Sequence, residues 1–128
     1  MDVEIEYQVN HNDGTVHGSR AQLLRAIHNL VSNAIDAVDP ITGRIVLGCQ
    51  DDGDKLQIHV EDNGCGMADD VVQRFFQPYF TTKASGKGTG LGTAISKRIV
   101  EEHEGIISVE STLDKGTKVT ITLPLCRQ

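Results

Sequence analysis

Two asparagines that fall on one face of a predicted helix are the first candidates for chemistry in this sequence. Asn29 and Asn33 lie four residues apart within residues 19–38, where apolar residues recur at helical spacing. Asparagine is a poor helix former in mid-helix, so the presence of two of them suggests a functional role. An amide oxygen is a hard ligand that Mg²⁺ accepts beside water and phosphate oxygens. The pair indicates a metal or phosphate site, although a solvated helix face has the same spacing.

A carboxylate at the end of a predicted strand is the second candidate. Asp62 follows the strand expected over 56–61 and opens the sequence Asp62-Asn63-Gly64-Cys65-Gly66-Met67. Glycines there would let the backbone pass close to a flat ligand. The carboxylate would accept a hydrogen bond from an exocyclic amine such as that of adenine, and it would reject guanine, which presents a carbonyl oxygen. An ordinary turn has a similar composition, so both interpretations stay open.

A run of alternating glycines precedes another predicted helix. Gly86, Gly88, Gly90 and Gly92 alternate up to a helix expected from about Leu91. Successive backbone N–H groups ahead of a helix N-terminus form an anion site. The spacing lacks the third glycine of a dinucleotide fingerprint, and the chain has no G-x-x-x-x-G-K-[ST] motif. The run therefore predicts a phosphate site of another kind.

The aromatic residues crowd against this glycine run. The stretch 75–92 holds all three phenylalanines, one of the two tyrosines and four of the thirteen glycines. Aromatic rings favour burial, whereas glycines favour a flexible backbone. The combination predicts a hinged cover over a ligand.

The elements that must position these residues follow from periodicity and turn signals. Alternation predicts strands, 3.6-residue spacing predicts helices, and Ser19 with Gln22 forms a capping box. We expect strands at 3–9, 15–17, 44–50, 56–61, 106–111 and 118–125, helices at 19–38, 68–76 and 91–103, and a turn at 12–14. This order indicates an α+β fold, a two-layer α/β sandwich with one sheet covered on one face by helices.

Composition limits the classes of function. The 128 residues predict one domain, 1–128, and the net charge of −6 argues against direct nucleic-acid binding. The three cysteines have no metal-like spacing, and no apolar run is long enough to span a bilayer. Met1 begins directly on a strand-like pattern without a signal segment. We therefore expect a cytoplasmic domain, although a longer parent protein could be membrane-anchored.

Five segments together resemble the motifs of two-component sensor histidine kinases. Residues 29–34 resemble their asparagine box, 62–67 their first glycine box, 75–83 their phenylalanine box, 88–92 their second glycine box and 116–117 the terminal Gly-Thr motif. The match runs in order over nearly the whole chain. It implies the Bergerat (GHKL) fold, with a mixed, mainly antiparallel sheet, about three helices and a flexible ATP lid. The sequence FFQPYFTTK most resembles the nitrogen-regulation branch.

The resemblance implies that the ligands are ATP and Mg²⁺. Asn33 would coordinate Mg²⁺ and Asn29 would support the metal or the phosphates. Asp62 would bind the adenine amine, with Thr117 nearby. The base pocket would be shaped by Gly64, Gly66 and Met67. The phosphates would meet Lys83, Lys87, Gly88, Thr89, Gly90, Leu91 and Gly92. The lid would be anchored by Phe75, Phe76 and Phe80.

One position bears on whether the site transfers or hydrolyses phosphate. The resemblance implies that the ATP-hydrolysing relatives carry a glutamate four residues before the metal asparagine, where this chain has Asn29. An amide cannot accept a proton near neutral pH, so water would stay unactivated. Two departures from the family pattern are Asp36, where many sensor kinases have a basic residue, and Thr93, where leucine is common.

The partners follow from what the chain lacks. None of its five histidines lies in the His-Glu-x-x-x-Pro-like helix that the family uses as phosphoacceptor. The resemblance therefore implies that the chain is the catalytic domain, itself monomeric, of a homodimeric kinase. A separate dimerisation domain would carry the acceptor histidine, and a response regulator would receive the phosphoryl group. Three alternatives stay open: an ATP-gated ATPase module of the gyrase or mismatch-repair kind, a serine-kinase anti-sigma factor, and a degenerate domain that binds partners without ATP.

Overall fold

The computed structural model describes residues 4–10, 16, 18–78 and 91–125. The elements are β1 (Glu4–Asn10), α1 (Arg20–Ala37), β2 (Arg44–Asp52), β3 (Lys55–Asp62), α2 (Asp69–Val72), α3 (Leu91–Glu102), β4 (Ile106–Thr112) and β5 (Gly116–Pro124). The helix predicted over 68–76 is wrong beyond its first half. Its N-cap residue, Ala68, makes no side-chain capping bond, and the chain continues in three-residue turns such as Phe75 N–H to the Val72 carbonyl.

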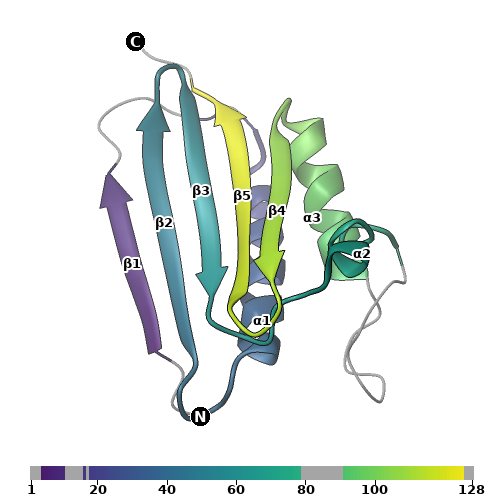
Figure 1. The fold of residues 1–128 in the computed structure, drawn as a ribbon. Helices are drawn as coiled ribbons and strands as arrows, with labels where there is room; N and C mark the ends of the chain where they lie inside the picture. Colours follow the sequence, from purple (N-terminus) through teal and green to yellow (C-terminus); the bar gives the residue numbers. More distant parts are fainter. Residues whose placement is uncertain (1–3, 11–15, 17, 79–90, 126–128) are drawn as a thin grey trace.

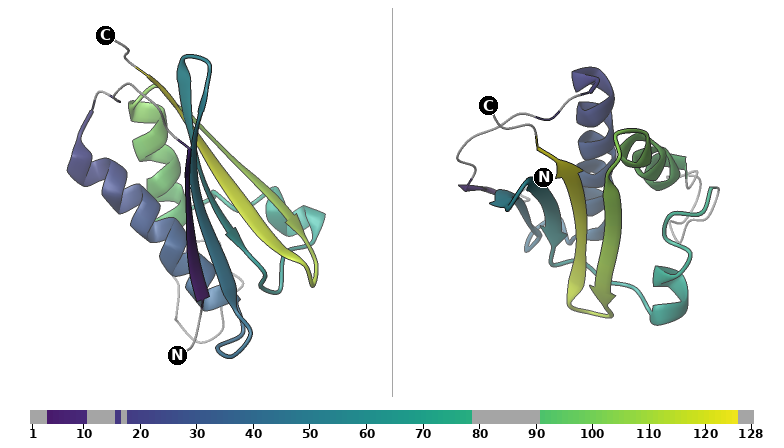
Figure 2. Two further views of the ribbon diagram at one scale, coloured as in Figure 1. Left: turned by 90° about the vertical axis from the view of Figure 1, so that its left-hand side faces the viewer. Right: turned by 90° about the horizontal axis from the view of Figure 1, so that it is seen from above.

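The strands form one sheet of mixed direction, as predicted. Its order is β1-β2-β3-β5-β4, with β1 parallel to β2 and every other pair antiparallel. Helices α1 and α3 pack on one face of the sheet and against each other, while no helix of the described residues covers the opposite face (Figures 1 and 2). The short α2 packs beside β4. Val16 lies outside the strands, and the other residues of the predicted segments 12–14 and 15–17 lie outside the described part of the chain.

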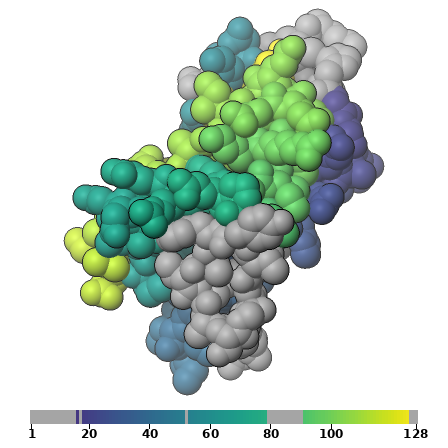
Figure 3. All heavy atoms as spheres, turned by 90° about the vertical axis from the view of Figure 1, so that its right-hand side faces the viewer, coloured from purple at the N-terminus to yellow at the C-terminus, as the bar shows by residue number. Residues whose placement is uncertain are grey.

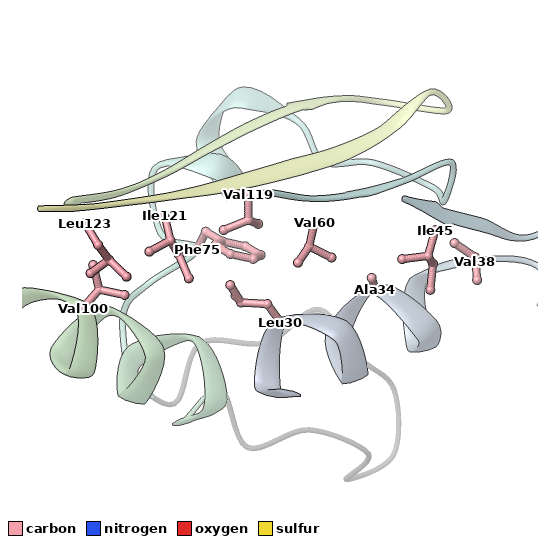
Figure 4. Packing of buried hydrophobic residues seen from close by; sticks show 10 residues of the cluster. All are labelled: Leu30, Ala34, Val38, Ile45, Val60, Phe75, Val100, Val119, Ile121 and Leu123. Carbon is pink, nitrogen blue, oxygen red and sulfur yellow. The ribbon is translucent and has the colours of Figure 1, made fainter. Parts of the chain in front are cut away.

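The hydrophobic core lies between the sheet and the two long helices (Figure 4). The predicted apolar stripe of α1 is confirmed, because its members are buried or packed against the core: Leu23, Ile27, Leu30, Val31, Ala34 and Val38. The sheet contributes Ile45, Val60, Val119, Ile121 and Leu123, and α3 contributes Val100. Apolar surface removed from water in this layer is the main source of stability.

Strand register divides the helix-facing side of the sheet into an apolar part and a polar end. Two rows across β2, β3, β5 and β4 hold mainly apolar side chains. These rows are Leu47–Val60–Val119–Val109 and Cys49–Ile58–Ile121–Ile107. The row at the end of the sheet is Ile45–Asp62–Thr117–Ser111, which we call the polar row. Three hydrogen-bonding side chains thus stand at one edge of an otherwise apolar surface.

Candidate nucleotide site

Asp62 is a buried hydrogen-bond acceptor at the end of β3. It is only 9% exposed, and its Oδ1 accepts a hydrogen bond from the Gly64 N–H at 2.8 Å. Burial raises the pKa of this carboxyl above its usual value, while the N–H groups of Gly64 and Thr117 act in the opposite direction. The predicted placement of the carboxylate at a strand end is confirmed. A buried carboxyl of this kind can hold a hydrogen-bond donor of a ligand.

The glycines after Asp62 let the loop pass between α1 and the β4–β5 hairpin. A Cβ on Gly64 would lie 2.5 Å from the Ala37 carbonyl oxygen, and one on Gly66, whose φ is +67°, would overlap the Thr112 carbonyl. The Cys65 N–H donates to the Ala37 carbonyl at 3.3 Å. Larger residues would therefore displace this loop.

Asn63 has a structural role in the same loop. Its Oδ1 accepts a hydrogen bond from the Arg44 N–H at 2.7 Å, and its Nδ2 donates to the Thr42 carbonyl at 3.1 Å. The side chain thereby joins the end of β3 to the segment that leads into β2.

The asparagine face of α1, which carries Asn29 and Asn33, contacts the first turn of α3 through Asn29. Figure 3 shows atoms of α1 and α3 side by side at the molecular surface. The Asn29 Nδ2 donates to the Gly92 carbonyl at 3.4 Å. Because a carbonyl oxygen only accepts, this contact leaves Oδ1 of Asn29 for another partner. Asn33 is half-buried on the same helix, and its side chain makes no hydrogen bond within the described residues. The structure therefore brings the Asn29 amide to Gly92, while Asn33 lies four residues further along the same helix.

Ser111 is a residue of the site that the sequence analysis missed. Its Oγ accepts the Met67 N–H at 2.8 Å, donates to the Gly116 carbonyl at 3.0 Å and lies 2.8 Å from the Thr117 Oγ1. It thus joins the loop after Asp62 to both strands of the last hairpin. One signal was available, because Ser111 continues the alternation of Ile107 and Val109 on β4 and is the polar member of that series.

The segment that precedes residues 79–90 is anchored in the core. Phe75 is 7% exposed, and its ring packs edge-on against that of Phe76 at 4.9 Å. The Thr93 Oγ1 donates to the Phe75 carbonyl at 2.8 Å, so the first turn of α3 is tied to this anchor. The predicted packing of Phe75 and Phe76 in the core is confirmed, whereas the lid that they were predicted to anchor lies outside the described residues. The remaining predicted site residues, Phe80, Lys83, Lys87, Gly88, Thr89 and Gly90, lie outside the described residues.

A hollow of about 390 Å³ opens at the same end of the sheet, but mostly over its open face. It is lined by Asp62, Ser111 and Thr117 of the polar row together with the charged residues Glu61, Lys118 and Glu110. Lys118 is the cross-strand neighbour of both Glu61 and Glu110, and opposite charges at such positions attract each other. Neither Asn29 nor Asn33 lines this hollow. Both asparagines lie on α1, which packs on the helix-facing side of the sheet.

The described residues also limit how a metal ion could be held. Within them no three His, Cys, Asp or Glu side chains are grouped so as to bind a metal ion. A cation at this site would therefore depend on amide oxygens supplemented by ligand and water oxygens, a set that suits Mg²⁺.

No helix in the described part of the chain is long and apolar enough to cross a membrane.

Comparison with known families identifies the family of the chain. Residues 18–127 match the family described as histidine kinase-, DNA gyrase B-, and HSP90-like ATPase. The chain belongs to this family. Among curated relatives, this histidine kinase-type domain is 39% identical over 112 residues to sporulation kinase B of Bacillus subtilis, covering 88% of the chain and 26% of the relative. It is 36% identical over 124 residues to the sensor histidine kinase ZraS of Escherichia coli K12, covering 97% and 26%.

Solved structures of sensor histidine kinases have the same fold as this ATPase-family domain. The mycobacterial sensor histidine kinase MprB superposes with a TM-score of 0.85 at 29% identity, covering 99% of this chain and 85% of that one. Full-length ShkA in complex with AMPPNP also gives a TM-score of 0.85 at 26% identity, covering 99% and 26%. The chain spans about a quarter of the length of the two curated relatives. The predicted α+β fold and the predicted family are both confirmed.

Proposed function

We propose that this domain binds ATP with Mg²⁺ and serves as the phosphoryl donor half of a sensor histidine kinase. The adenine amine would bind at Asp62 beside Thr117, and the phosphates would lie at the start of α3 near Leu91 and Gly92. The observation that supports the proposal is that the buried Asp62 belongs to the helix-facing polar row, while Asn29 contacts the first turn of α3 in the helix layer that covers the same side of the sheet. Full-length ShkA, whose structure contains AMPPNP, shares this fold.

The residues fit a nucleotide-bound Mg²⁺. Asn33 has a side-chain amide without a hydrogen-bond partner in the described chain, and Asn29 keeps its Oδ1 available. Both are neutral oxygen ligands of the kind that Mg²⁺ accepts beside phosphate oxygens. When bound, the ion would neutralise charge on the phosphates. Gly64, Gly66 and Met67 would shape the base pocket, and we retain Phe80, Lys83, Lys87, Gly88, Thr89 and Gly90 as proposed ligand contacts.

Asn29 favours phosphoryl transfer over hydrolysis. Its amide cannot remove a proton from water near neutral pH, so the chain supplies no general base at this place. We propose that the γ-phosphoryl group passes to an imidazole nitrogen of a histidine on a separate dimerisation domain. A P–N bond forms as the P–O bond to ADP breaks. The histidine would then pass the group to an aspartate of a response regulator. A homodimeric parent with a cytoplasmic catalytic domain follows from this proposal, and the nitrogen-regulation branch remains a prediction.

A phosphorylation assay tests the proposal. The chain is mixed with labelled ATP, Mg²⁺ and the separately expressed dimerisation domain of its own parent kinase. We expect acid-labile, base-stable label on that domain and slow phosphate release by the chain alone. Acid-stable label would identify a serine kinase, and rapid phosphate release by the isolated chain would favour an ATPase module. A lack of ATP binding below millimolar concentration would indicate a degenerate domain.

A further inference from the structure

Ser111 has more hydrogen-bonding contacts than it has hydrogens. Its single hydroxyl hydrogen has two possible acceptors, the Gly116 carbonyl oxygen at 3.0 Å and the Thr117 Oγ1 at 2.8 Å. Its oxygen already accepts the Met67 N–H at 2.8 Å. The Gly116 carbonyl oxygen cannot donate, whereas the Thr117 hydroxyl can donate or accept.

Only one arrangement of hydrogens satisfies all three contacts. Ser111 donates to the Gly116 carbonyl, and the Thr117 hydroxyl donates to the Ser111 Oγ. If Ser111 instead donated to Thr117, its contact with the Gly116 carbonyl would contain no hydrogen. Unsatisfied polar contacts at part-buried positions are unfavourable, so the first arrangement is preferred. The hydrogen of Thr117 is then committed to Ser111, and the Thr117 Oγ1 can only accept from a ligand.

The orientation of Thr117 matters because of its place in the sheet. Thr117 is the cross-strand partner of Asp62, and directly opposed side chains on one face lie about 4.5–5.5 Å apart at Cβ. Both residues belong to the polar row, so two acceptors stand side by side at the end where we propose that the base binds. An exocyclic amine has two hydrogens for such a pair, whereas a ring carbonyl has none.

We infer that Ser111 determines base selectivity by fixing Thr117 as an acceptor, so that the site takes a 6-amino purine and rejects a 6-oxo purine. This inference rests on the proposed function, because it assumes that a nucleotide base binds beside Asp62. Without Ser111, the Thr117 hydroxyl is free to rotate and to donate to a carbonyl oxygen. A mismatch of a buried polar group is the kind of penalty that gives strong discrimination.

The test is the ratio of the Kd for inosine triphosphate to the Kd for ATP, measured with Mg²⁺ on the whole chain. Ser111→Ala is expected to lower this ratio about tenfold, the equivalent of about 1.4 kcal/mol. Ser111→Thr keeps the hydroxyl and should retain the wild-type ratio. Ser108→Ala is a matched control, because it removes a hydroxyl from an exposed position of the same strand. If Ser111→Ala does not fold, Ser111→Cys, a weak donor and acceptor, should lower the ratio in the same direction.

A double variant separates the mechanism from a general loosening of the pocket. In a Thr117→Val background no hydroxyl can rotate, so Ser111→Ala should change the ratio less than about twofold. The inference is overturned if Ser111→Ala keeps the wild-type ratio, if it lowers the ratio equally without Thr117, or if the wild type does not distinguish the two nucleotides. A wild-type chain that binds neither nucleotide would refute the proposed function itself, whereas selective ATP binding unaffected by Ser111 would refute only the role of Ser111.

Discussion

The two ends of the layer between helices and sheet are built in opposite ways. At the end where α1 begins, the Ser19 N–H donates to the His103 Nε2 at 3.0 Å, and the His103 Nδ1 contacts the Ile99 carbonyl at 2.7 Å. Because a carbonyl only accepts, Nδ1 must carry the hydrogen, and both ring nitrogens are then satisfied by the backbone. A Cβ on Gly18 would overlap this ring, so the junction is also closely packed.

The end that holds the polar row leaves three groups able to contact a ligand. Asp62 is buried with a raised pKa, Asn33 has no hydrogen bond within the described chain, and Asn29 keeps one amide oxygen. No buried side-chain polar atom of the described residues lacks a hydrogen bond, so these groups can take a ligand without leaving a buried group unsatisfied in its absence. Helix α1 is therefore held in place at its start, and its later turns carry the proposed binding residues Asn29 and Asn33. Changes at the first end should cost stability, and changes at the second should cost binding.

Asp62→Asn should have the largest effect and should act on binding alone. The side-chain NH₂ would face the donor hydrogens of the base, so ATP affinity should fall about 100-fold, measured by displacement of a fluorescent ATP analogue. The free energy of unfolding at neutral pH should not fall, because a buried charge is removed. Asp54→Asn, a change of an exposed carboxylate beyond the other end of β3, serves as the control. If Asp62→Asn lost folding as well as binding, the claim that this end of the layer acts on binding alone would be wrong.

His103→Ala should have the next largest effect and should act on stability alone. It removes two hydrogen bonds and leaves the Ser19 N–H without its acceptor, which should lower the free energy of unfolding by about 1–2 kcal/mol. Urea unfolding measures the change, and His28→Ala, at an exposed position of α1, provides the matched control. The Kd for ATP of the folded variant should stay within about twofold of the wild type. A large loss of affinity would show that the two ends are coupled.

Thr93→Val lies between the two ends and should have a smaller effect on both properties. Loss of the hydrogen bond to the Phe75 carbonyl should lower the free energy of unfolding by about 1 kcal/mol. The same loss frees the first turn of α3, so ATP affinity should fall a few-fold. Thermal melting and ATP titration are compared with those of Thr120→Val, whose position on β5 pairs with His59. Unchanged affinity would show that this tie does not position the phosphate-binding turn.

A pH series should give the smallest change in the free energy of unfolding. It tests whether the buried charge of Asp62 lowers stability. Its pKa is higher in the folded protein than the ordinary value of 3.8, so the folded state binds the proton more tightly than the unfolded chain. This contribution is fully present below pH 3.8 and is lost as pH rises through the folded-state pKa. The wild type should therefore lose stability relative to Asp62→Asn as pH rises through this window. Parallel urea curves at several pH values measure the difference, and a constant difference would contradict it.

The elements and the main binding residues were accessible from the sequence because they depend on local patterns. Alternation predicted β2–β5, helical spacing predicted α1 and α3, and turn glycines marked the loop after Asp62. The extent of α2 was not accessible, because the chain leaves the α-helix after Val72 and continues in turns that bury Phe75 in the core. The roles of Ser111 and His103 depend on contacts with residues far away in the sequence, which no local pattern contains. Ser111 bonds a residue 44 positions away, and His103 bonds one 84 positions away. Pairing of β1 with β2 in parallel is equally non-local.

The central claim is that the nucleotide binds on the helix-facing side, between the polar row and the asparagine face of α1. A crystal structure of the chain with AMPPNP and Mg²⁺ tests it most directly. We expect the 6-amino group of the base within hydrogen-bond distance of Asp62 and the cation within coordination distance of the Asn33 Oδ1. A base lodged in the hollow on the open face, among Glu61, Lys118 and Glu110, would contradict the account.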